Sequence, residues 1–238
     1  MKIAIDLGHN CTFDKGANGI MSEDTINKEV GSKVITKLKQ LCHNVIDVTP
    51  SSATSLSDSL SKRVMKANQN QVDAYVSIHA NAGGGKGSEV FAMSSKGKEI
   101  GSKVLNEILM LGYVNRGIKD GSKLYVIKNT NAPAILIELF FVDSVEDCTK
   151  YNSEALSNAI VKGLTGQLPV NRPYPGYLLQ YNPKVYDKNV ELIQKRIGII
   201  DDGYFGNATK GAVTRYQQSN GLVADGIVGP ATWNKLFN

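Results

Sequence analysis

The chain has 238 residues, of which 42% are hydrophobic and 21% are charged, a composition typical of a globular protein with one substantial domain and a smaller one. No apolar run reaches the about 18 residues that a membrane-spanning helix needs, which excludes insertion into a membrane. The formal net charge is +5, but Lys and Arg are scattered rather than clustered, which argues against a nucleic-acid partner.

The N-terminus and the cysteines both bear on where the protein is made. The apolar stretch after Met1 is too short for the hydrophobic region of a signal peptide. Cys11, Cys42 and Cys148 are odd in number and widely spaced, so they predict no disulfide framework. We therefore expect synthesis in the cytoplasm without a signal peptide.

Apolar runs typical of buried strands alternate with helical patterns in the first part of the chain. We expect strands at 2–8, 44–49, 73–79, 88–93, 124–127 and 134–142. The clearest helix follows Ser22, a good N-cap residue, and runs from Glu23 to Leu41. Further helices are expected at 55–70, 96–111 and 153–166. The alternation predicts an α/β domain at 1–168 with a mostly parallel, twisted sheet of about six strands and flanking helices.

The amino-acid composition of the chain changes after residue 168. Prolines and tyrosines gather in 169–182, which predicts a stiff linker. In the remaining residues, 183–238, the segment 202–209 (DGYFGNAT) recurs 23 positions later as 225–232 (DGIVGPAT). Each copy combines an Asp-Gly turn with a helix start, so we expect a small domain of three helices at about 186–197, 207–219 and 230–237. Its expected core residues are Ile193, Ile197, Phe205, Val213, Tyr216, Leu222, Trp233 and Leu236.

Two histidines, His9 and His79, stand where a strand-like run ends in a turn. The carboxyl ends of parallel strands line the ligand crevice of an α/β fold, so these imidazoles could share one metal ion. A catalytic zinc ion takes three protein ligands, commonly two His and a carboxylate, and Glu23 in the first turn after the His9 loop is the candidate carboxylate. Taken singly, each His could be structural, and Glu23 could serve only the helix dipole. Cys11 is a weaker alternative, because His-x-Cys is not a recurrent zinc spacing.

Glu138 lies inside the strongly apolar run 132–142. An ionised Glu is almost never buried without a partner. We therefore expect Glu138 to face a partner or an active site, where a carboxylate can accept a proton from water and pass it to a leaving group.

These residues carry a resemblance to a known family. The matching segments are 5–9 (IDLGH), 14–17 (DKGA), Glu23, 75–82 (YVSIHANA), 115–119 (NRGIK) and 133–138 (PAILIE). Residues 1–168 resemble the zinc-dependent N-acetylmuramoyl-L-alanine amidases of the amidase 3 type. Residues 183–238 resemble the small helical peptidoglycan-binding module, through the repeated Asp-Gly turns and the ending Thr232-Trp233-x-x-Leu236.

The resemblance implies hydrolysis of the amide between the lactyl group of N-acetylmuramic acid and L-alanine in bacterial peptidoglycan. It implies that His9, Glu23 and His79 bind Zn²⁺ and that Glu138 is the catalytic acid/base. Arg116 and Asn81, near the same edge of the sheet, are candidates to orient the peptide or the oxyanion, although a loop arginine is often only solvated.

Other functions remain open at this point. The same metal ligands would also serve an endopeptidase or carboxypeptidase that cuts within the stem peptide, and a wall-binding protein with a degenerate site is a third alternative. A substrate outside the cytoplasm and no signal peptide together favour a phage endolysin released through a holin, with a sporulation mother-cell amidase as the alternative. The C-terminal module could recognise glycan, peptide or a secondary wall polymer, and the oligomeric state is open.

Overall fold

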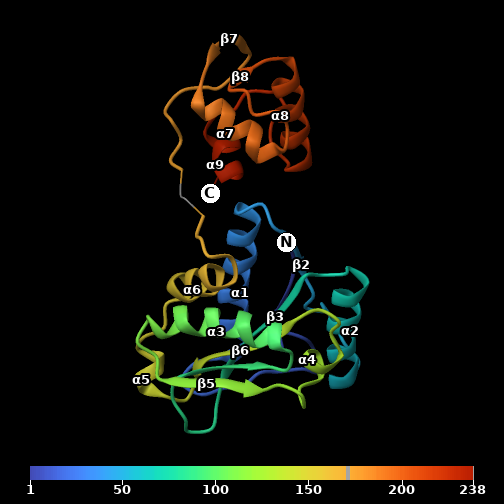
Figure 1. Ribbon diagram of the computed structural model, residues 1–238, viewed down its shortest axis with the longest axis vertical. Coiled ribbons are helices and arrows are strands. Elements are labelled where there is room, and N and C mark those ends of the chain that lie inside the picture. The colour runs from blue at the N-terminus through green and yellow to red at the C-terminus, as the bar shows by residue number, and fades with distance from the viewer. Residues whose placement is uncertain (170–171, 238) are drawn as a thin grey trace. The chain divides into compact units, whose positions relative to one another are not determined.

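A computed structural model describes residues 1–169 and 172–237 (Figure 1). The chain forms two compact units, Met1–Pro169 and Val170–Asn238. Residues 170 and 171 of the predicted linker and residue 238 of the predicted C-terminal domain lie outside the described residues. Within the described part, no helix has the length and apolar character needed to cross a membrane.

A six-stranded sheet forms the centre of the first unit, counted over the described residues. Its strands are β1 (Lys2–Leu7), β2 (Asn44–Asp47), β3 (Ala74–Asn81), β4 (Ser88–Ala92), β5 (Asn115–Asp120) and β6 (Ala134–Phe141), in the spatial order β2-β1-β3-β6-β4-β5. Neighbouring strands are parallel throughout, except that β4 runs antiparallel to β6. The predicted α/β fold with a mostly parallel sheet is confirmed.

Helices cover both faces of this sheet (Figure 1). One hydrophobic core lies between the sheet and the helices α1 (Glu23–Gln40), α3 (Ser95–Leu109) and α6 (Ser153–Thr165). A second core lies between the sheet and the helices α2 (Leu56–Gln69) and α4 (Tyr125–Asn129). The short helix α5 (Val145–Cys148) follows β6. Ile3 and Ile5 belong to the first core and Ala4 to the second, because successive side chains of a strand point to opposite faces. Strands with a core on each side read as continuous apolar runs, which is why they are visible in the sequence.

Three elements of the first unit differ from the expectation, one of which is the short helix α5, where none was expected. Residues 124–127 were expected to form a strand but lie at the start of α4, where Val126 and Ile127 are buried against the sheet. A short apolar run can be one turn of a buried helix as readily as a strand. The sixth strand is instead β5, whose residues Asn115–Asp120 are exposed or half-buried. It is an edge strand without an apolar pattern, so periodicity could not reveal it.

The second unit contains the three expected helices, α7 (Lys188–Ile197), α8 (Asn207–Ser219) and α9 (Pro230–Phe237). A two-stranded antiparallel sheet of β7 (Asn182–Tyr186) and β8 (Tyr204–Phe205), which flank α7 in the chain, was not expected. The buried core of this unit consists of Leu179, Val190, Ile193, Phe205, Val213, Val228, Trp233 and Leu236. Leu222 was expected in this core but is only half-buried, and Leu179, Val190 and Val228 were missed.

The described part of the predicted linker packs against the second unit. Leu179 pairs through its backbone with Val228, with N–O distances of 3.1 and 2.8 Å. The Trp233 indole donates a hydrogen bond to the Arg172 carbonyl (2.6 Å), and Tyr174 packs edge-on against the same indole. We call residues 172–181 the strap. Its apolar side chains extend a core that three short helices could not fill by themselves.

The sequence repeat corresponds to a repeated hydrogen-bond network around a buried glutamine. Gln194 donates to Asp202, the Tyr204 carbonyl and Thr209, and accepts from the Gly203 amide. Gln217 makes the same four bonds to the residues 23 positions further along the chain, namely Asp225, Ile227, Thr232 and Gly226. Each glutamine therefore holds one Asp-Gly turn against the helix that follows it.

Candidate metal centre

His9 directly follows β1 in a left-handed turn. His9 and Asn10 have φ angles of 59° and 55°, a conformation uncommon for residues other than glycine. The Asn10 side chain donates hydrogen bonds to the backbone oxygens of Gly8 and Asp24, both at 3.0 Å. These bonds tie the turn to the start of α1, where Glu23 lies.

His79 lies near the end of β3, beside Gly8. A Cβ atom on Gly8 would lie 2.3 Å from His79 Nε2, so only glycine lets the imidazole approach the end of β1 this closely. The rings of His9 and His79 meet edge to face, with centroids 4.8 Å apart. The structure thus brings together the two strand-end histidines that the sequence singled out.

Glu23, the first residue of α1, lies between the two imidazoles. Its Oε1 atom is 3.3 Å from His9 Nε2 and 3.0 Å from His79 Nδ1, and its Oε2 atom accepts a hydrogen bond from the Ala17 amide (2.8 Å). The ligand atoms of His9, Glu23 and His79 all lie within 4.8 Å of one another. Cys11 is buried but is not part of this group.

The electrostatics of the three groups are tightly linked. Burial lowers the pKa of His9, but hydrogen bonds to Asp14 and Glu23 outweigh it and raise this pKa to about 10. Burial raises the pKa of Glu23, but the hydrogen bonds from His79 and His9 outweigh it and hold this pKa well below its usual range. Glu23 is therefore ionised, as a carboxylate ligand of a cation must be.

A second carboxylate, Asp14, orients His9 from the side opposite Glu23. Its Oδ1 atom is 2.7 Å from His9 Nδ1, and its Oδ2 atom accepts hydrogen bonds from Ser59 (2.8 Å) and Arg63 (3.2 Å). Burial raises the pKa of Asp14, but the hydrogen bonds from His9 and Ser59 outweigh it and lower this pKa to about 2. A carboxylate on the second ring nitrogen is the usual support of a metal-binding His, because it sets the tautomer and the ring orientation.

Arg63 joins this support to the interior of the sheet. Its side chain is 1% exposed and its guanidinium donates to Asp6, to Asp14 and to the carbonyl oxygen of His9. Asp6, also 1% exposed, accepts further hydrogen bonds from Tyr75 and Ser77, both at 2.7 Å. The left-handed His9 backbone is therefore held by a buried arginine whose charge is balanced by two carboxylates.

Glu138 lies in β6, in register with His79 of β3 and Glu89 of β4. Its Oε2 atom is buried and has no hydrogen-bond partner among the described residues. Burial raises the pKa of Glu138 to about 7, with the Glu23 and Glu89 carboxylates adding to this effect and His79 opposing it. Of the two expectations for Glu138, a partner or an active site, the structure provides no hydrogen-bond partner for Oε2 among the described residues, and the active-site role stays a prediction.

Arg116 and Asn81 both bind a residue that sequence reasoning missed. Glu89 is 4% exposed and accepts hydrogen bonds from Arg116 Nε and Asn81 Nδ2, both at 3.0 Å. The Arg116 guanidinium also lies over the Phe141 ring, 4.9 Å from its centroid. Glu89 thus connects the two predicted substrate-binding side chains to the strand beside Glu138.

Two of the missed residues, Asp6 and Glu89, share one signal, a charge inside an apolar strand. Asp6 interrupts β1, Glu89 interrupts β4 and Arg63 stands on the buried face of α2. The argument that singled out Glu138 applies to Asp6 and Glu89, whereas the polar sequence of α2 gives no sign that Arg63 is buried. Asp14 belongs to a motif that supported the family resemblance, but no role was inferred for it.

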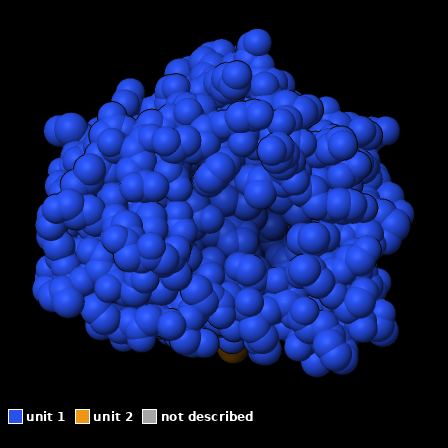
Figure 2. Space-filling view, turned by 90° about the horizontal axis from the view of Figure 1, so that it is seen from below, with its two compact units in different colours: residues 1–169 blue, residues 170–238 orange. Residues whose placement is uncertain are grey.

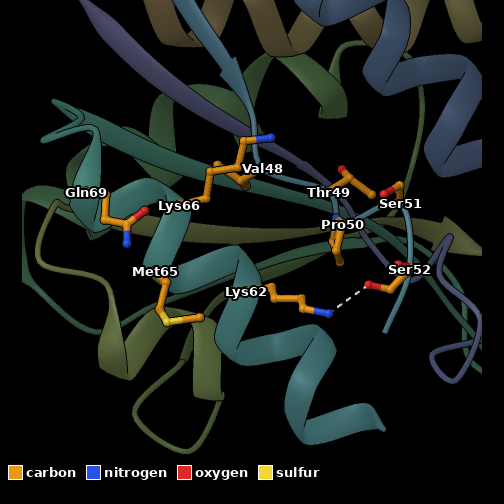
Figure 3. A pocket seen from close by; sticks show the side chains of 9 residues that line it. All are labelled: Val48, Thr49, Pro50, Ser51, Ser52, Lys62, Met65, Lys66 and Gln69. Atoms are coloured by element: carbon orange, nitrogen blue, oxygen red, sulfur yellow. Dashed lines mark hydrogen bonds between the residues drawn. The ribbon is translucent and has the colours of Figure 1, made fainter. Parts of the chain in front are cut away.

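A separate pocket lies between the segment that follows β2 and the helix α2. It has a volume of about 550 Å³ and is lined by Val48, Thr49, Pro50, Ser51, Ser52, Lys62, Met65, Lys66 and Gln69 (Figure 3). Lys62 reaches across it to the Ser52 carbonyl (3.1 Å). None of the predicted site residues lines it. Figure 2 shows that one face of residues 1–169 is also hollowed near its centre.

Comparisons with known proteins cover both units. Residues 3–168 match the model of the N-acetylmuramoyl-L-alanine amidase family, and residues 187–236 match a peptidoglycan binding domain. An endolysin of Bacillus phage SPP1 is 33% identical over 175 residues, which are 67% of this chain and 61% of that protein. The amidase LytC of Bacillus subtilis is 31% identical over 69% of this chain and 33% of its own length.

Solved structures agree with these matches. The catalytic domain of the CD27L endolysin, which targets Clostridia difficile, superposes with a TM-score of 0.65 at 28% identity, covering 70% of this chain and 98% of that domain. The catalytic domain of the amidase CwlV from Paenibacillus polymyxa gives 0.59 at 31% identity, covering 68% and 93%. Two relatives from Clostridium perfringens are longer, since this chain spans 48% and 55% of their lengths.

Proposed function

The chain belongs to the N-acetylmuramoyl-L-alanine amidase family, and we propose that it hydrolyses the amide between the lactyl group of N-acetylmuramic acid and L-alanine in bacterial peptidoglycan. The observation that carries this proposal is the convergence of His9, Glu23 and His79 beside Glu138, whose buried Oε2 atom has no partner among the described residues. We assign catalysis to residues 1–168 and wall binding to residues 183–238, with 169–182 as their connection.

The three converging side chains fit a zinc ion. Two imidazoles and one carboxylate are a common ligand set of catalytic zinc, which leaves one position open for water or substrate. Glu23 is ionised and Asp14 fixes the His9 ring, so both side chains are oriented before a cation arrives, and binding would release the proton that the raised pKa keeps on His9. A bound zinc ion supplies Lewis acidity, which polarises the scissile carbonyl and lowers the pKa of water.

Glu138 is the proposed acid/base. A general acid/base works best when its pKa lies near the operating pH, and burial places that of Glu138 at about 7. Its carboxylate accepts a proton from the attacking water and delivers it to the alanine nitrogen as the amide bond breaks. Because its Oε2 atom has no competing hydrogen bond in the described protein, that oxygen is free for this transfer.

Arg116 and Asn81 are proposed to orient the substrate. Glu89 binds Arg116 through Nε, which leaves the two terminal nitrogens of the guanidinium available for a peptide carbonyl or carboxylate. The stacking on Phe141 fixes the plane of that guanidinium. Asn81 is held by the same carboxylate, so the two side chains form one oriented pair.

We further propose that the protein acts as an endolysin, made in the cytoplasm and released to the wall through a holin. The similarity to the endolysin of phage SPP1 supports this role. The chain is also 29% identical over 168 residues to a sporulation-specific amidase of Bacillus subtilis. A mother-cell role is therefore the alternative.

The test measures metal, activity and product together. Purified protein is expected to contain about one zinc ion per chain and to clear a suspension of peptidoglycan, and a chelator should abolish clearing until zinc is restored. Mass spectrometry should find intact stem peptides that begin with L-alanine. New ends inside the stem peptide would instead indicate a peptidase.

Glu138→Ala tests the acid/base role directly. We expect wall clearing to fall by about 10²- to 10⁴-fold while zinc content is retained, because the proton transfer is lost but the ligands are not. Glu99→Ala, which removes an exposed carboxylate from α3, is the matched control and should clear walls normally. Full activity of Glu138→Ala would show that the mechanism is wrong.

A further inference from the structure

A pocket of about 240 Å³ lies wholly within the second unit, where the strap meets β7 and α7. Its floor is apolar and belongs to the core of the unit: Leu179, Val190 and Phe205 are at most 3% exposed. Around this floor stand exposed apolar and neutral polar side chains, together with one acid. They are Tyr177, Leu178, Gln180, Tyr181, Asn182, Val185 and Asp187.

Four of the residues that line the pocket are exposed apolar side chains. Tyr177, Leu178, Tyr181 and Val185 are each between 47% and 56% exposed, although they lie within nine consecutive residues. Single exposed apolar residues are ordinary, but several that line one concavity mark a binding site. These four side chains are therefore candidates for the wall-contacting surface of the second unit.

One aromatic wall of the pocket is held in place before any ligand arrives. The Tyr177 hydroxyl donates to Asp187 Oδ2 (2.8 Å) and accepts from Asn189 Nδ2 (2.9 Å). The other oxygen of Asp187 caps α7 by accepting from the Asn189 amide (2.7 Å). A ring fixed in this way loses little conformational entropy when a ligand packs on it.

The charge of the lining selects among the components of a bacterial wall. Neither Lys nor Arg is among the described residues that line the pocket, and its only acid, Asp187, is already engaged by Tyr177 and α7. A stem-peptide carboxylate or a phosphate-bearing polymer would find no cationic partner there. A sugar ring, by contrast, offers an apolar face to an aromatic ring and neutral hydroxyl and acetamido groups to side-chain amides such as Gln180 and Asn182.

We propose that this pocket binds the glycan strand of peptidoglycan, with one sugar residue packed between the Tyr177 and Tyr181 rings. The proposal rests on the wall-binding role assigned above to residues 183–238, whose core the strap completes, and it selects glycan over peptide and anionic polymer as the ligand. The pocket suits a single residue of a longer chain, since its volume of about 240 Å³ is below that of sites that enclose a whole small molecule.

The test measures binding of the full chain to purified glycan strands from which stem peptides and secondary polymers have been removed. We expect Tyr181→Ala to weaken binding by about tenfold, the effect of losing one anchoring aromatic side chain. Tyr181→Phe keeps the ring and should bind within about twofold of the unchanged protein. Tyr204→Ala is the matched control, because it removes a tyrosine of similar exposure in the same unit that does not line the pocket.

The outcomes separate this proposal from the proposed enzymatic function. Stripped strands contain no lactyl–alanine amide, so their binding does not depend on amidase activity, which the wall-clearing assay measures by itself. Unchanged binding by a folded Tyr181→Ala protein would overturn the proposal. Retention of the unchanged protein on free stem peptides or on an anionic wall polymer, but not on stripped strands, would also overturn it.

Discussion

The two units of this chain bury polar side chains in different ways. In the second unit, Gln194 and Gln217 are each about 1% exposed. Each makes four hydrogen bonds to an Asp-Gly turn and to a threonine of the helix that follows it. In the first unit, Arg63 and two carboxylates form a charged network that ends at His9. Beside that network, the buried Oε2 atom of Glu138 stays without a partner in the described protein.

This difference distinguishes buried polar groups that stabilise the fold from buried polar groups that bind a metal or substrate. A satisfied glutamine specifies one turn geometry and offers nothing to a ligand. Charged groups that converge without full satisfaction cost stability and are retained where a cation or substrate completes them. Three sets of substitutions can test this contrast.

The largest effect is expected from Arg63→Met. Removing the guanidinium leaves Asp6 and Asp14 buried without their cation, so the free energy of unfolding should fall by about 3–5 kcal/mol in chemical denaturation. Zinc affinity, measured by competition with a chelator, should fall by about 10- to 100-fold because the orientation of His9 is lost. Lys62→Met, on the exposed side of the same helix, should change stability by less than about 1 kcal/mol.

A milder variant covers the case in which Arg63→Met does not fold. Ser59→Ala keeps every charge and removes only the hydroxyl that donates to Asp14 Oδ2. We expect a folded protein with zinc affinity weakened by severalfold. Zinc affinity equal to that of the unchanged protein in both variants would show that the network supports the fold alone.

The second effect concerns Glu138 in the metal-free protein. The pKa of Glu138 in the folded protein, about 7, lies above the ordinary value of 4.5. The folded state is therefore fully stable with respect to this group below pH 4.5, and it loses free energy of unfolding as the pH rises through 7 and the buried carboxyl must ionise. Glu138→Gln removes this loss. At alkaline pH it should be more stable than the unchanged protein by roughly 3 kcal/mol, with the difference vanishing in acid.

The measurement is chemical denaturation at a series of pH values in the presence of a chelator. Glu99→Gln serves as control, because Lys96 and Lys103 lower the pKa of that exposed carboxyl and so cannot produce a loss at alkaline pH. Parallel stability curves for the unchanged protein and Glu138→Gln would contradict the assignment of Glu138 as a buried group without a partner.

The smallest effect is expected in the second unit. Gln194→Leu and Gln217→Leu should each lower its free energy of unfolding by about 2 kcal/mol, and by similar amounts, because each leaves equivalent turn groups unpaired. Trp233 is the single tryptophan of the chain and is buried in this unit, so its fluorescence reports unfolding there. Gln218→Leu, at an exposed neighbouring position, is the control. A change in zinc affinity in either variant would contradict the conclusion that these glutamines serve only the folding of the second unit.

Local patterns were sufficient for much of the fold. The strands β1, β3 and β6 are buried on both faces and appear as apolar runs, and the helices of both units begin and end close to the expected residues. The pattern failed at β5 and α4. An exposed edge strand has no apolar signal, and a single buried helical turn has the same signal as a strand.

Part of the candidate site could be predicted for a similarly simple reason. Parallel strands end at one edge of a sheet, so the residues at the carboxyl ends of β1 and β3 meet there whatever the details of packing. Glu138 stands out because a charge within an apolar strand needs an explanation. Arg63 carries no such signal, because α2 is a polar helix, and its partners Asp6 and Asp14 lie 57 and 49 positions away, where no local rule selects them.

The sequence by itself determined the α/β alternation, the repeated turns, and the strand-end positions of His9 and His79, because these follow from side-chain periodicity and turn chemistry within a few residues. The tertiary structure decided which charges meet: that Glu23 lies between the imidazoles, that Asp14 and Arg63 hold His9, that Glu89 joins Arg116 to Asn81, and that the strap completes a core and a pocket. Such contacts join segments far apart along the chain, and they form only where close packing excludes water and makes each buried charge require its partner.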